Sequence, residues 1–454
     1  MVRSTKWHDK AASCRRTGSG FKMHRSIVLL LVALTGCTTV PISFTQPANR
    51  RSTSTLTPAN AEPLKLGLLF SLSGSLARYG STMQDTTQML VETVNGCNGV
   101  LGQAVQLLSE DDQSSATVGR TAMRRLAEVQ RVGAVIGAIG SEVSNAAVDI
   151  AVKNQVVQIS PASASSVLTE RAQKGALQGF WFRTMPPDPV QGEALARLAQ
   201  KRGFKTVSVL AIDNDYGNSI ARSFEATFKQ LGGTVSGSSN RYSPYAALYG
   251  VDFYTAFSGQ PDAVLIVAEP YLGSEILKTA FESGLWSGNT KVLLTASMKT
   301  ENLASRVGQS IDGRYIASGV VGIAPATSSP VMEAFRDNYK KRFNRAPNLY
   351  DPNTWDAAAV TILAAEAAKA TSGTAIKGKI LEVANPPGLE VSDICRALAL
   401  VREGKDINYQ GVSGPVDFTK SGDVIGSYEV WTIDYTGKIK IDSTIQAGKD
   451  PAGK

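Results

Sequence analysis

Residues 132–168 read VGAVIGAIGSEVSNAAVDIAVKNQVVQISPASASSVL, and they carry the clearest structural pattern in the chain. Two short runs within them, Ala134–Ile139 and Val156–Ile159, are rich in Val and Ile, as buried parallel strands are. Between these runs, residues 144–154 place apolar side chains at helical spacing. A strand, a helix and a second strand in so short a stretch form a βαβ unit. The stretch therefore predicts part of a parallel sheet.

Serine residues follow both predicted strands. Ser141 and Ser144 come after the first strand, and Ser163 and Ser165 lie in the loop after the second. Ligands of open α/β sheets bind beyond the carboxyl ends of the strands. Hydroxyl groups and the unpaired N–H groups of a helix start also suit an anionic group. Serines at such places are equally common as helix caps and turn residues, so the pattern predicts either a binding edge or ordinary capping.

The N-terminus has the features of an export signal. A short basic start at Met23–Arg25 precedes an apolar run at Ile27–Leu34, which is far shorter than the ~20 residues that span a bilayer. The following Leu-Thr-Gly-Cys sequence resembles a bacterial lipobox, which implies cleavage before Cys37 and a lipid on that residue. Cleavage beside an unmodified cysteine is the alternative. We expect residues 1–36 to be a signal peptide with an N-terminal extension, and either Met1 or Met23 to be the start.

The segments that flank the main body are expected to lack regular structure. Residues 37–61 are rich in Thr, Ser, Pro and Asn, which predicts a flexible tether behind the lipid anchor. Residues 447–454 are expected to be a disordered tail. The formal net charge of the whole chain is +8, but residues 37–454 carry 40 basic and 38 acidic residues, a net charge of +2. The basic character thus belongs largely to the leader, and we expect no binding of nucleic acid.

The mature chain is expected to contain no histidine, because His8 and His24 both precede Cys37. A Ser-His-Asp or Cys-His relay and a histidine-ligated zinc site are therefore excluded. The sequence also lacks a P-loop, a G-x-G-x-x-G motif after a strand and a G-x-S-x-G elbow. We expect no cofactor, no metal and no enzymatic activity, although a carboxylate pair or a Ser-Lys dyad would need no histidine.

Two cysteines remain beyond the leader and the predicted anchor. Cys14 lies in the leader, Cys37 is the lipidation candidate, and Cys97 and Cys395 are left. An even pair in an exported chain favours one disulfide, whereas two unpaired core thiols are the alternative.

Strands and helices alternate along the main body, which predicts doubly wound parallel sheets. The expected strands are 64–70, 104–109, 134–139, 156–159, 206–212, 234–236, 263–268, 291–295, 314–321, 416–418 and 428–434. The expected helices are 81–95, 115–131, 144–154, 191–202, 217–231, 272–283, 301–307, 330–343, 354–369, 375–383 and 392–403. Met185–Pro189, which contains three prolines, separates the first set from the second.

Six segments together resemble a known family. They read LKLGLLFSLSGSLARYG, VNGCNGVLGQAVQLLSEDDQ, VGAVIGAIGSEVSNAAVDIA, VVQISPASASSVLTE, VSVLAIDNDYGNSIARSFEATFKQLGG and GVSGPVDFTKSGD. In this order they resemble the type I periplasmic solute-binding proteins of ABC importers, the branched-chain amino acid (Leu/Ile/Val-binding) family. The resemblance implies two Rossmann-like lobes joined by a three-segment hinge, with crossings near 185–188, 320–323 and 428–430.

The implied boundaries place two separate segments in each lobe. Lobe one would comprise residues 62–185 and 322–428, and lobe two residues 186–321 and 429–446. Cys97 and Cys395 would then share lobe one, which supports their pairing.

The resemblance also implies a site for the carboxylate of an amino acid in lobe one. The family binds this group with hydroxyl and backbone N–H groups, and the matching positions are Ser141, Ser163 and Ala164. Ala164 stands where the family often has threonine, so Ser165 is the expected replacement for the missing hydroxyl.

Further positions match the cleft of the family. Tyr79 and Tyr216 correspond to aromatic residues from opposite lobes. The family places an ammonium-binding acid after the strand that corresponds to 291–295, where this chain has none before Glu301. Glu269, after the strand at 263–268, is the candidate substitute, and a solvated loop glutamate is the alternative. Asp351 and Trp355 are expected near the hinge.

The resemblance implies an exported solute-binding lipoprotein in the periplasm or at the cell surface. Its partners would be a small polar ligand, an amino acid or a related solute, and an ABC permease in the membrane. Only the lipid anchor would contact the bilayer. The alternative is an outer-membrane interaction lipoprotein of the same fold, such as an activator of cell-wall synthases, and an occluded or unlined cleft would favour it.

Overall fold

The computed structural model describes residues 62–446 except 237–239, 244–250, 287–288 and 327–328. All of these residues lie in one compact unit of the chain. Four expected features fall outside the described residues: the signal peptide, the lipidation of Cys37, the tether and the C-terminal tail. Within the described part, no helix has both the length and the apolar character needed to cross a membrane.

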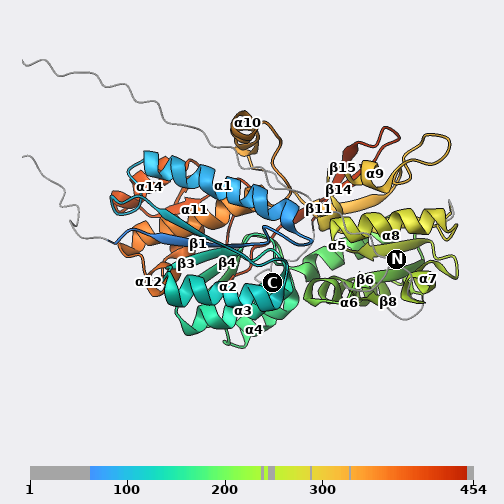
Figure 1. Cartoon of the computed structure of the whole chain (residues 1–454), viewed down its shortest axis with the longest axis horizontal. Coiled ribbons are helices and arrows are strands. Elements are labelled where there is room, and N and C mark those ends of the chain that lie inside the picture. The colour runs from blue at the N-terminus through green and yellow to red at the C-terminus, as the bar shows by residue number, and fades with distance from the viewer. Residues whose placement is uncertain (1–61, 237–239, 244–250, 287–288, 327–328, 447–454) are drawn as a thin grey trace, which may run out of the picture. The chain divides into compact units, whose positions relative to one another are not determined.

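The first sheet has five parallel strands in the order β2-β1-β3-β4-β5. Alternate residues of its strands face opposite sides: Leu66 and Leu68 pack toward α1, whereas Leu69 packs with residues of α2 and α3. Figure 1 shows these helices beside the strands of the sheet. Helices therefore cover both faces of this sheet, as parallel sheets require. The elements are β1 (Lys65–Phe70), α1 (Ala77–Gly96), β2 (Gln106–Asp111), α2 (Ala116–Arg124), η1 (Arg125–Val129), β3 (Ala134–Gly137), α3 (Ser141–Lys153), β4 (Val157–Ser160), α4 (Ser166–Gln173) and β5 (Trp181–Arg183).

The second sheet is mostly parallel and has an antiparallel edge. Its order is β15-β14-β11-β10-β9-β6-β7, with β8 also paired to β6, and β14 and β15 run antiparallel. The elements are α5 (Asp188–Lys201), β6 (Thr206–Ile212), α6 (Asp215–Gln230), β7 (Thr234–Val235), β8 (Asn240–Tyr242), α7 (Val251–Phe257), β9 (Ala263–Val267), α8 (Pro270–Glu282), β10 (Lys291–Leu294), η2 (Ala296–Met298), α9 (Leu303–Val307), β11 (Val321–Pro325), β14 (Ser427–Ile433) and β15 (Ile439–Gln446).

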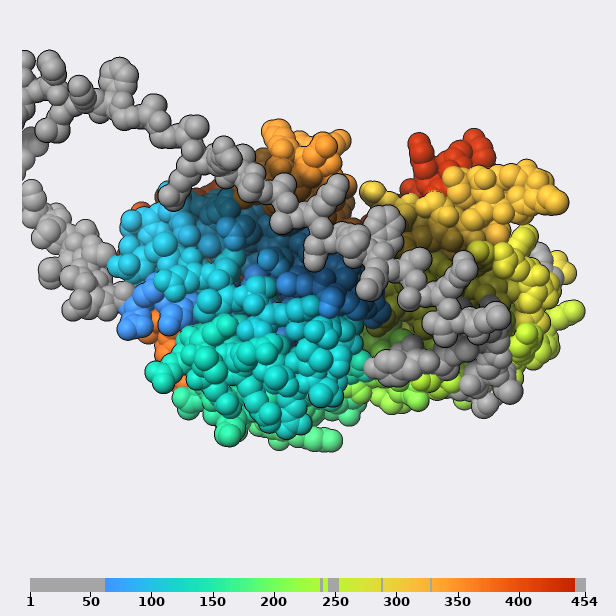
Figure 2. All heavy atoms as spheres, viewed as in Figure 1, coloured from blue at the N-terminus to red at the C-terminus, as the bar shows by residue number. Residues whose placement is uncertain are grey.

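The segment between β11 and β14 returns to the first sheet. Its α11 (Asp351–Ala368) contacts β3, β4 and α1, and fifteen of its eighteen residues are buried. The other elements of this segment are α10 (Met332–Phe343), α12 (Gly373–Lys377), α13 (Ile380–Ala384), β12 (Leu389–Val391), α14 (Ile394–Arg402) and β13 (Ile407–Tyr409). In the space-filling view, α10 stands out from the surface of lobe one (Figure 2).

A disulfide joins the two segments of lobe one. Cys97, directly after α1, is bonded to Cys395 in α14, and their Cα atoms are 5.6 Å apart. Next to it, Arg402 donates hydrogen bonds to the carbonyl oxygens of Cys97 (2.9 Å) and Gly99 (2.6 Å). The end of α1 is thus tied to α14 by covalent and polar contacts.

The two-lobed α/β fold is confirmed, and several element boundaries need correction. The strand expected at 314–321 is instead β11, because residues 316–319 form a turn and Gly319 has a φ of +84°, which breaks extended structure. No strand forms at 416–418, where only isolated bridges join Gln410 to Pro415 and Phe418 to Val424. The single helix expected at 375–383 is divided into α12 and α13.

The strand β11 lies where the second crossing between the lobes is expected. Every residue of β11 pairs with β14, and β11 also pairs with β10, so the strand belongs to the second sheet over its full length. This strand overlaps the crossing expected near 320–323, and it continues in the second sheet to Pro325. The limits of the two lobes remain a proposal.

A candidate ligand site between the two lobes

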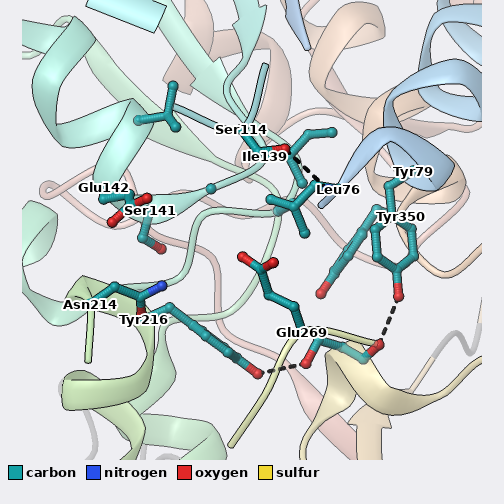
Figure 3. A pocket seen from close by; sticks show the side chains of 14 residues that line it. Leu76, Tyr79, Ser114, Ile139, Ser141, Glu142, Asn214, Tyr216, Glu269 and Tyr350 are labelled. Carbon is teal, nitrogen blue, oxygen red and sulfur yellow. Dashed lines mark hydrogen bonds between the residues drawn. The ribbon is translucent and has the colours of Figure 1, made fainter. Parts of the chain in front are cut away.

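A pocket lies between the two lobes, at the carboxyl ends of strands from both sheets (Figure 3). The enclosed cavity is small, about 50 Å³, and the unfilled space including its opening to solvent is about 570 Å³. Four of the residues predicted from the sequence, Tyr79, Ser141, Tyr216 and Glu269, line it, whereas Ser163, Ala164 and Ser165 do not. The lining residues are Leu76, Tyr79, Ser114, Ile139, Gly140, Ser141, Glu142, Val143, Ala162 and Tyr350 of lobe one, and Asn214, Tyr216, Glu269 and Ser297 of lobe two.

Ser141 is the first residue of α3 and is 4% exposed. Its Oγ accepts hydrogen bonds from the backbone N–H groups of Ala164 and Ser165, both at 3.2 Å. A serine hydroxyl has two acceptor lone pairs and one hydrogen, so these bonds leave the hydrogen to donate. Ser141 can therefore offer one donor to an acceptor in the pocket, next to the unpaired N–H groups that begin every α-helix.

The other hydroxyls of the predicted carboxylate site serve the protein itself. Ser163 Oγ donates to the carbonyl oxygens of Ala138 and Ile139, both at 3.1 Å, and lies 2.7 Å from Ser144 Oγ. Ser165 caps α4, because its Oγ accepts from the N–H of Val167 at 3.2 Å. For Ser163 and Ser165, the structure thus matches the internal turn and capping roles.

Two tyrosines meet at Ser297 from opposite lobes. Tyr79 in α1 donates its hydroxyl to the carbonyl oxygen of Ser297 at 2.7 Å. Tyr216 in α6 lies 2.8 Å from Ser297 Oγ and donates to Thr295 Oγ1 at 2.8 Å (Figure 3). Burial raises the pKa of both phenols, so both hydroxyls stay protonated near neutral pH. The two rings form walls of the pocket, and the Tyr79 bond also joins the lobes.

Tyr350 is a pocket residue that the sequence reasoning missed. It directly precedes α11, is 7% exposed, and packs its ring edge against Tyr79 with the ring centroids 5.1 Å apart. Its hydroxyl makes no hydrogen bond within the described part of the chain, so it is available to a bound molecule. A tyrosine in a polar loop gives no sequence signal that separates it from an ordinary surface tyrosine.

The neighbours expected near the hinge have structural roles. Asp351 accepts hydrogen bonds from the Thr82 hydroxyl (2.8 Å) and from the N–H of Asn348 (2.7 Å). Trp355 packs against Phe335 with the ring centroids 5.7 Å apart. Neither Asp351 nor Trp355 lines the pocket.

Glu269 precedes α8, and its carboxylate reaches into the pocket from lobe two (Figure 3). Burial raises its pKa, and a hydrogen bond from Ser75 of lobe one acts in the opposite direction. The side chain is therefore a hydrogen-bond acceptor held between the lobes.

Glu142 is the second pocket residue missed from the sequence. It is the second residue of α3, and its pKa is raised by burial and further by the charges of Glu269 and Asp215. An acid in the first turn of a helix is usually explained by the helix dipole, so the sequence alone gave no reason to place it in the site.

Direct hydrogen bonds close the two lobes around the pocket. Asn145 Nδ2 donates to Asp215 Oδ2 at 3.1 Å, and the N–H of Ser166 donates to Ser219 Oγ at 2.9 Å. In both pairs the donor belongs to lobe one and the acceptor to lobe two. No cluster of three or more His, Cys, Asp and Glu residues suited to a metal occurs in the described ranges.

Comparisons with known proteins agree with this architecture. The chain is 24% identical over 394 residues to BasB of Halobacterium salinarum, the substrate-binding protein of a chemotactic signal transduction system, and the match covers 83% of this chain and 88% of BasB. It is 30% identical over 172 residues to the Leu/Ile/Val-binding protein BraC3 of Rhizobium johnstonii. That match spans 37% of this chain and less than half, 45%, of BraC3.

Two solved structures share the fold at low identity. The leucine-binding protein LivK of Thermotoga maritima superposes with a TM-score of 0.70 at 24% identity, covering 84% of this chain and 99% of LivK. LivJ of Streptococcus pneumoniae, solved with isoleucine, gives a TM-score of 0.68 at 21% identity, covering 86% of this chain and all of LivJ. The sequence profile of the family described as periplasmic binding protein matches residues 63–438. This profile covers most of the chain, and the chain therefore belongs to the periplasmic binding protein family.

Proposed function

We propose that this protein is an extracytoplasmic solute-binding lipoprotein that captures a small polar solute between its lobes and delivers it to an ABC importer. The observation that carries the proposal is the pocket, which both lobes line and which contains polar groups directed at its interior. Ser141 keeps a free hydroxyl hydrogen, Tyr350 a hydroxyl without a protein partner, and Glu269 a carboxylate without an ion pair within the described residues. Because polar groups that are available to a solute line this cleft, the alternative of an interaction lipoprotein with an unlined cleft is disfavoured.

The proposed mechanism is closure of a hinged pair of lobes on the solute. Ser141 and the start of α3 would hold an anionic or neutral acceptor group from lobe one. Glu269 would hold a cationic group from lobe two, and Tyr79 and Tyr216 would shield the solute from water. Named relatives support a small solute: BraC3 is a Leu/Ile/Val-binding protein, and a structurally similar protein of Rhodopseudomonas palustris was solved with benzoate.

A thermal-shift screen of amino acids, amines and aromatic acids tests the proposal. A solute present at a hundred times its dissociation constant should stabilise the protein by about 2.7 kcal/mol. Binding of the best hit should then be measured by calorimetry in wild type and in Tyr350→Phe, which removes one hydroxyl from the pocket. A screen in which no solute raises the melting temperature would count against solute binding.

A further inference from the structure

The charged residues that line the pocket are all acidic. Two of its fourteen lining residues, Glu142 and Glu269, are acidic, and none of these described residues is Lys or Arg. The two acids come from opposite lobes, so closing the lobes brings them together. Asp215, at the start of α6, adds a third carboxylate close enough to raise the pKa of Glu142.

None of these three carboxylates has a cationic partner within the described ranges of the chain. Glu269 has only the hydrogen bond from Ser75, and Asp215 accepts from Asn145. Two other shielded acids have a cationic partner, because Asp423 pairs with the buried Arg183 at 2.6 Å and Glu366 pairs with Arg402 at 3.1 Å. Asp351 and Asp356 are instead held by hydrogen bonds.

Unpaired carboxylates that are partly shielded from water are unfavourable. Burial penalises the charged form, and like charges that approach each other add repulsion. Removing a counter-charge from such a group is normally costly, so a cation supplied to these unpaired acids is favourable. A cationic ligand would supply that charge and would favour closure of the lobes.

The helix dipole accounts for only part of this arrangement. Glu142 occupies the second position of α3, where a negative charge is favourable in any helix. Glu333 occupies the same position in α10, yet it is exposed and lies outside the pocket. The dipole therefore explains an acid at this position in each helix, but it does not explain why Glu142 faces a second acid across a cavity.

We propose that the ligand of this pocket carries two cationic nitrogen groups, one that meets Glu269 and one that meets Glu142. The inference rests on the proposed function, because it names the class of solute for the same site. Basic amino acids and short aliphatic diamines both have this chemistry. They differ in the carboxylate, for which Ser141 and the start of α3 provide donors.

Three matched probes test the proposal by calorimetric titration. L-Lysine carries both cations and a carboxylate, L-norleucine lacks the second cation, and cadaverine lacks the carboxylate. Lysine, cadaverine or both should bind the wild-type protein about 10- to 100-fold more tightly than norleucine, the effect expected of one hydrogen-bonded charge. If lysine binds more tightly than cadaverine, the ligand is a basic amino acid. If cadaverine binds more tightly, the ligand is a diamine.

Single substitutions then assign the effect to the acids. Glu142→Gln should lower the affinity for the preferred dication about tenfold or more and remove its advantage over norleucine. Glu333→Gln is the matched control, because it removes an acid from the same position of another helix, and it should leave every affinity unchanged.

Two results would overturn the inference. One is that norleucine binds at least as tightly as lysine and cadaverine, and the other is that Glu142→Gln leaves the ratio of affinities unchanged. If dications fail while L-leucine or benzoate binds competitively with norleucine, the inference is wrong and the proposed function stands. If no solute binds at all, the proposed function fails with it.

Discussion

Replacing Ser141 with alanine should weaken both the fold and the site. The side chain accepts two backbone hydrogen bonds, from Ala164 and Ser165, and these two residues are 2% and 0% exposed. Ser141→Ala would therefore leave two shielded N–H groups without an acceptor. The same change removes the only hydroxyl hydrogen that Ser141 can donate into the pocket.

The magnitude follows from the geometry of these bonds. A buried donor without a partner costs about 1–3 kcal/mol. Both bonds are 3.2 Å long, at the upper end of the usual range for N–H···O bonds, so the lower value applies to each. Ser141→Ala should thus lower the free energy of unfolding by about 2 kcal/mol. The lost hydrogen bond to a charged ligand should weaken binding by about 1.5–3 kcal/mol, or roughly 10- to 100-fold.

Ser165→Ala is the matched control for this experiment. It keeps the backbone N–H that bonds to Ser141 and removes only the cap of α4, which should cost about 1 kcal/mol of stability with little effect on ligand affinity. Urea unfolding followed by circular dichroism measures the stability of both variants, and calorimetry measures binding. If Ser141→Ala unfolds like wild type, the two backbone bonds do not hold the loop. If it binds ligand as tightly as wild type, the pocket is not the site.

Three further predictions concern pH, the disulfide and the anchor. Burial raises the pKa of Asp188 to about 8, against the opposing charge of Arg183, so the folded protein keeps a proton that the unfolded chain releases near pH 4. The free energy of unfolding should consequently fall as the pH rises from about 4 to 8, by at most about 1.4 kcal/mol per pH unit. Urea unfolding at several pH values should show that the free energy of unfolding of Asp188→Asn depends less on pH than that of wild type. An equal pH dependence would contradict the raised pKa of Asp188. Replacing both Cys97 and Cys395 with alanine should lower the free energy of unfolding by about 2–4 kcal/mol. An unchanged midpoint of urea denaturation would show that the disulfide does not stabilise the folded protein. Cys37→Ser should move the protein from the membrane fraction to the soluble fraction, and mass spectrometry of an unlipidated wild-type N-terminus would refute the anchor.

The sequence predicted the fold well because its strands are short apolar runs followed by turn residues. The expected strand at 206–212 matches β6 residue for residue. The expected strand at 314–321 was wrong because its apolar residues obscured a glycine turn, and β15 was missed because its alternating polar pattern is typical of an exposed edge.

The site was harder to predict because hydroxyl groups and acids have several ordinary roles. Ser141 and Ser163 look alike in the sequence, but only Ser141 reaches the pocket, because Ser163 bonds to carbonyl oxygens in its own lobe. Glu142 and Tyr350 become recognisable only when lobe two is placed against them. Their role depends on contacts between residues far apart in the chain, which periodicity does not report.

The position of α11 in the chain has a consequence for how the protein is made. This almost fully buried helix packs on a sheet whose last strand, β5, ends at Arg183, yet the helix itself ends only at Ala368. At a synthesis rate of about 5–20 residues per second, the ribosome needs roughly 10–40 s to add the intervening residues. Throughout that interval one apolar face of the nascent sheet, including Ile136 and Ile159, has no helix α11 to cover it. The newborn chain thus exposes apolar strand residues until α11 has been made, and a chaperone that shields apolar segments would act on it during this period.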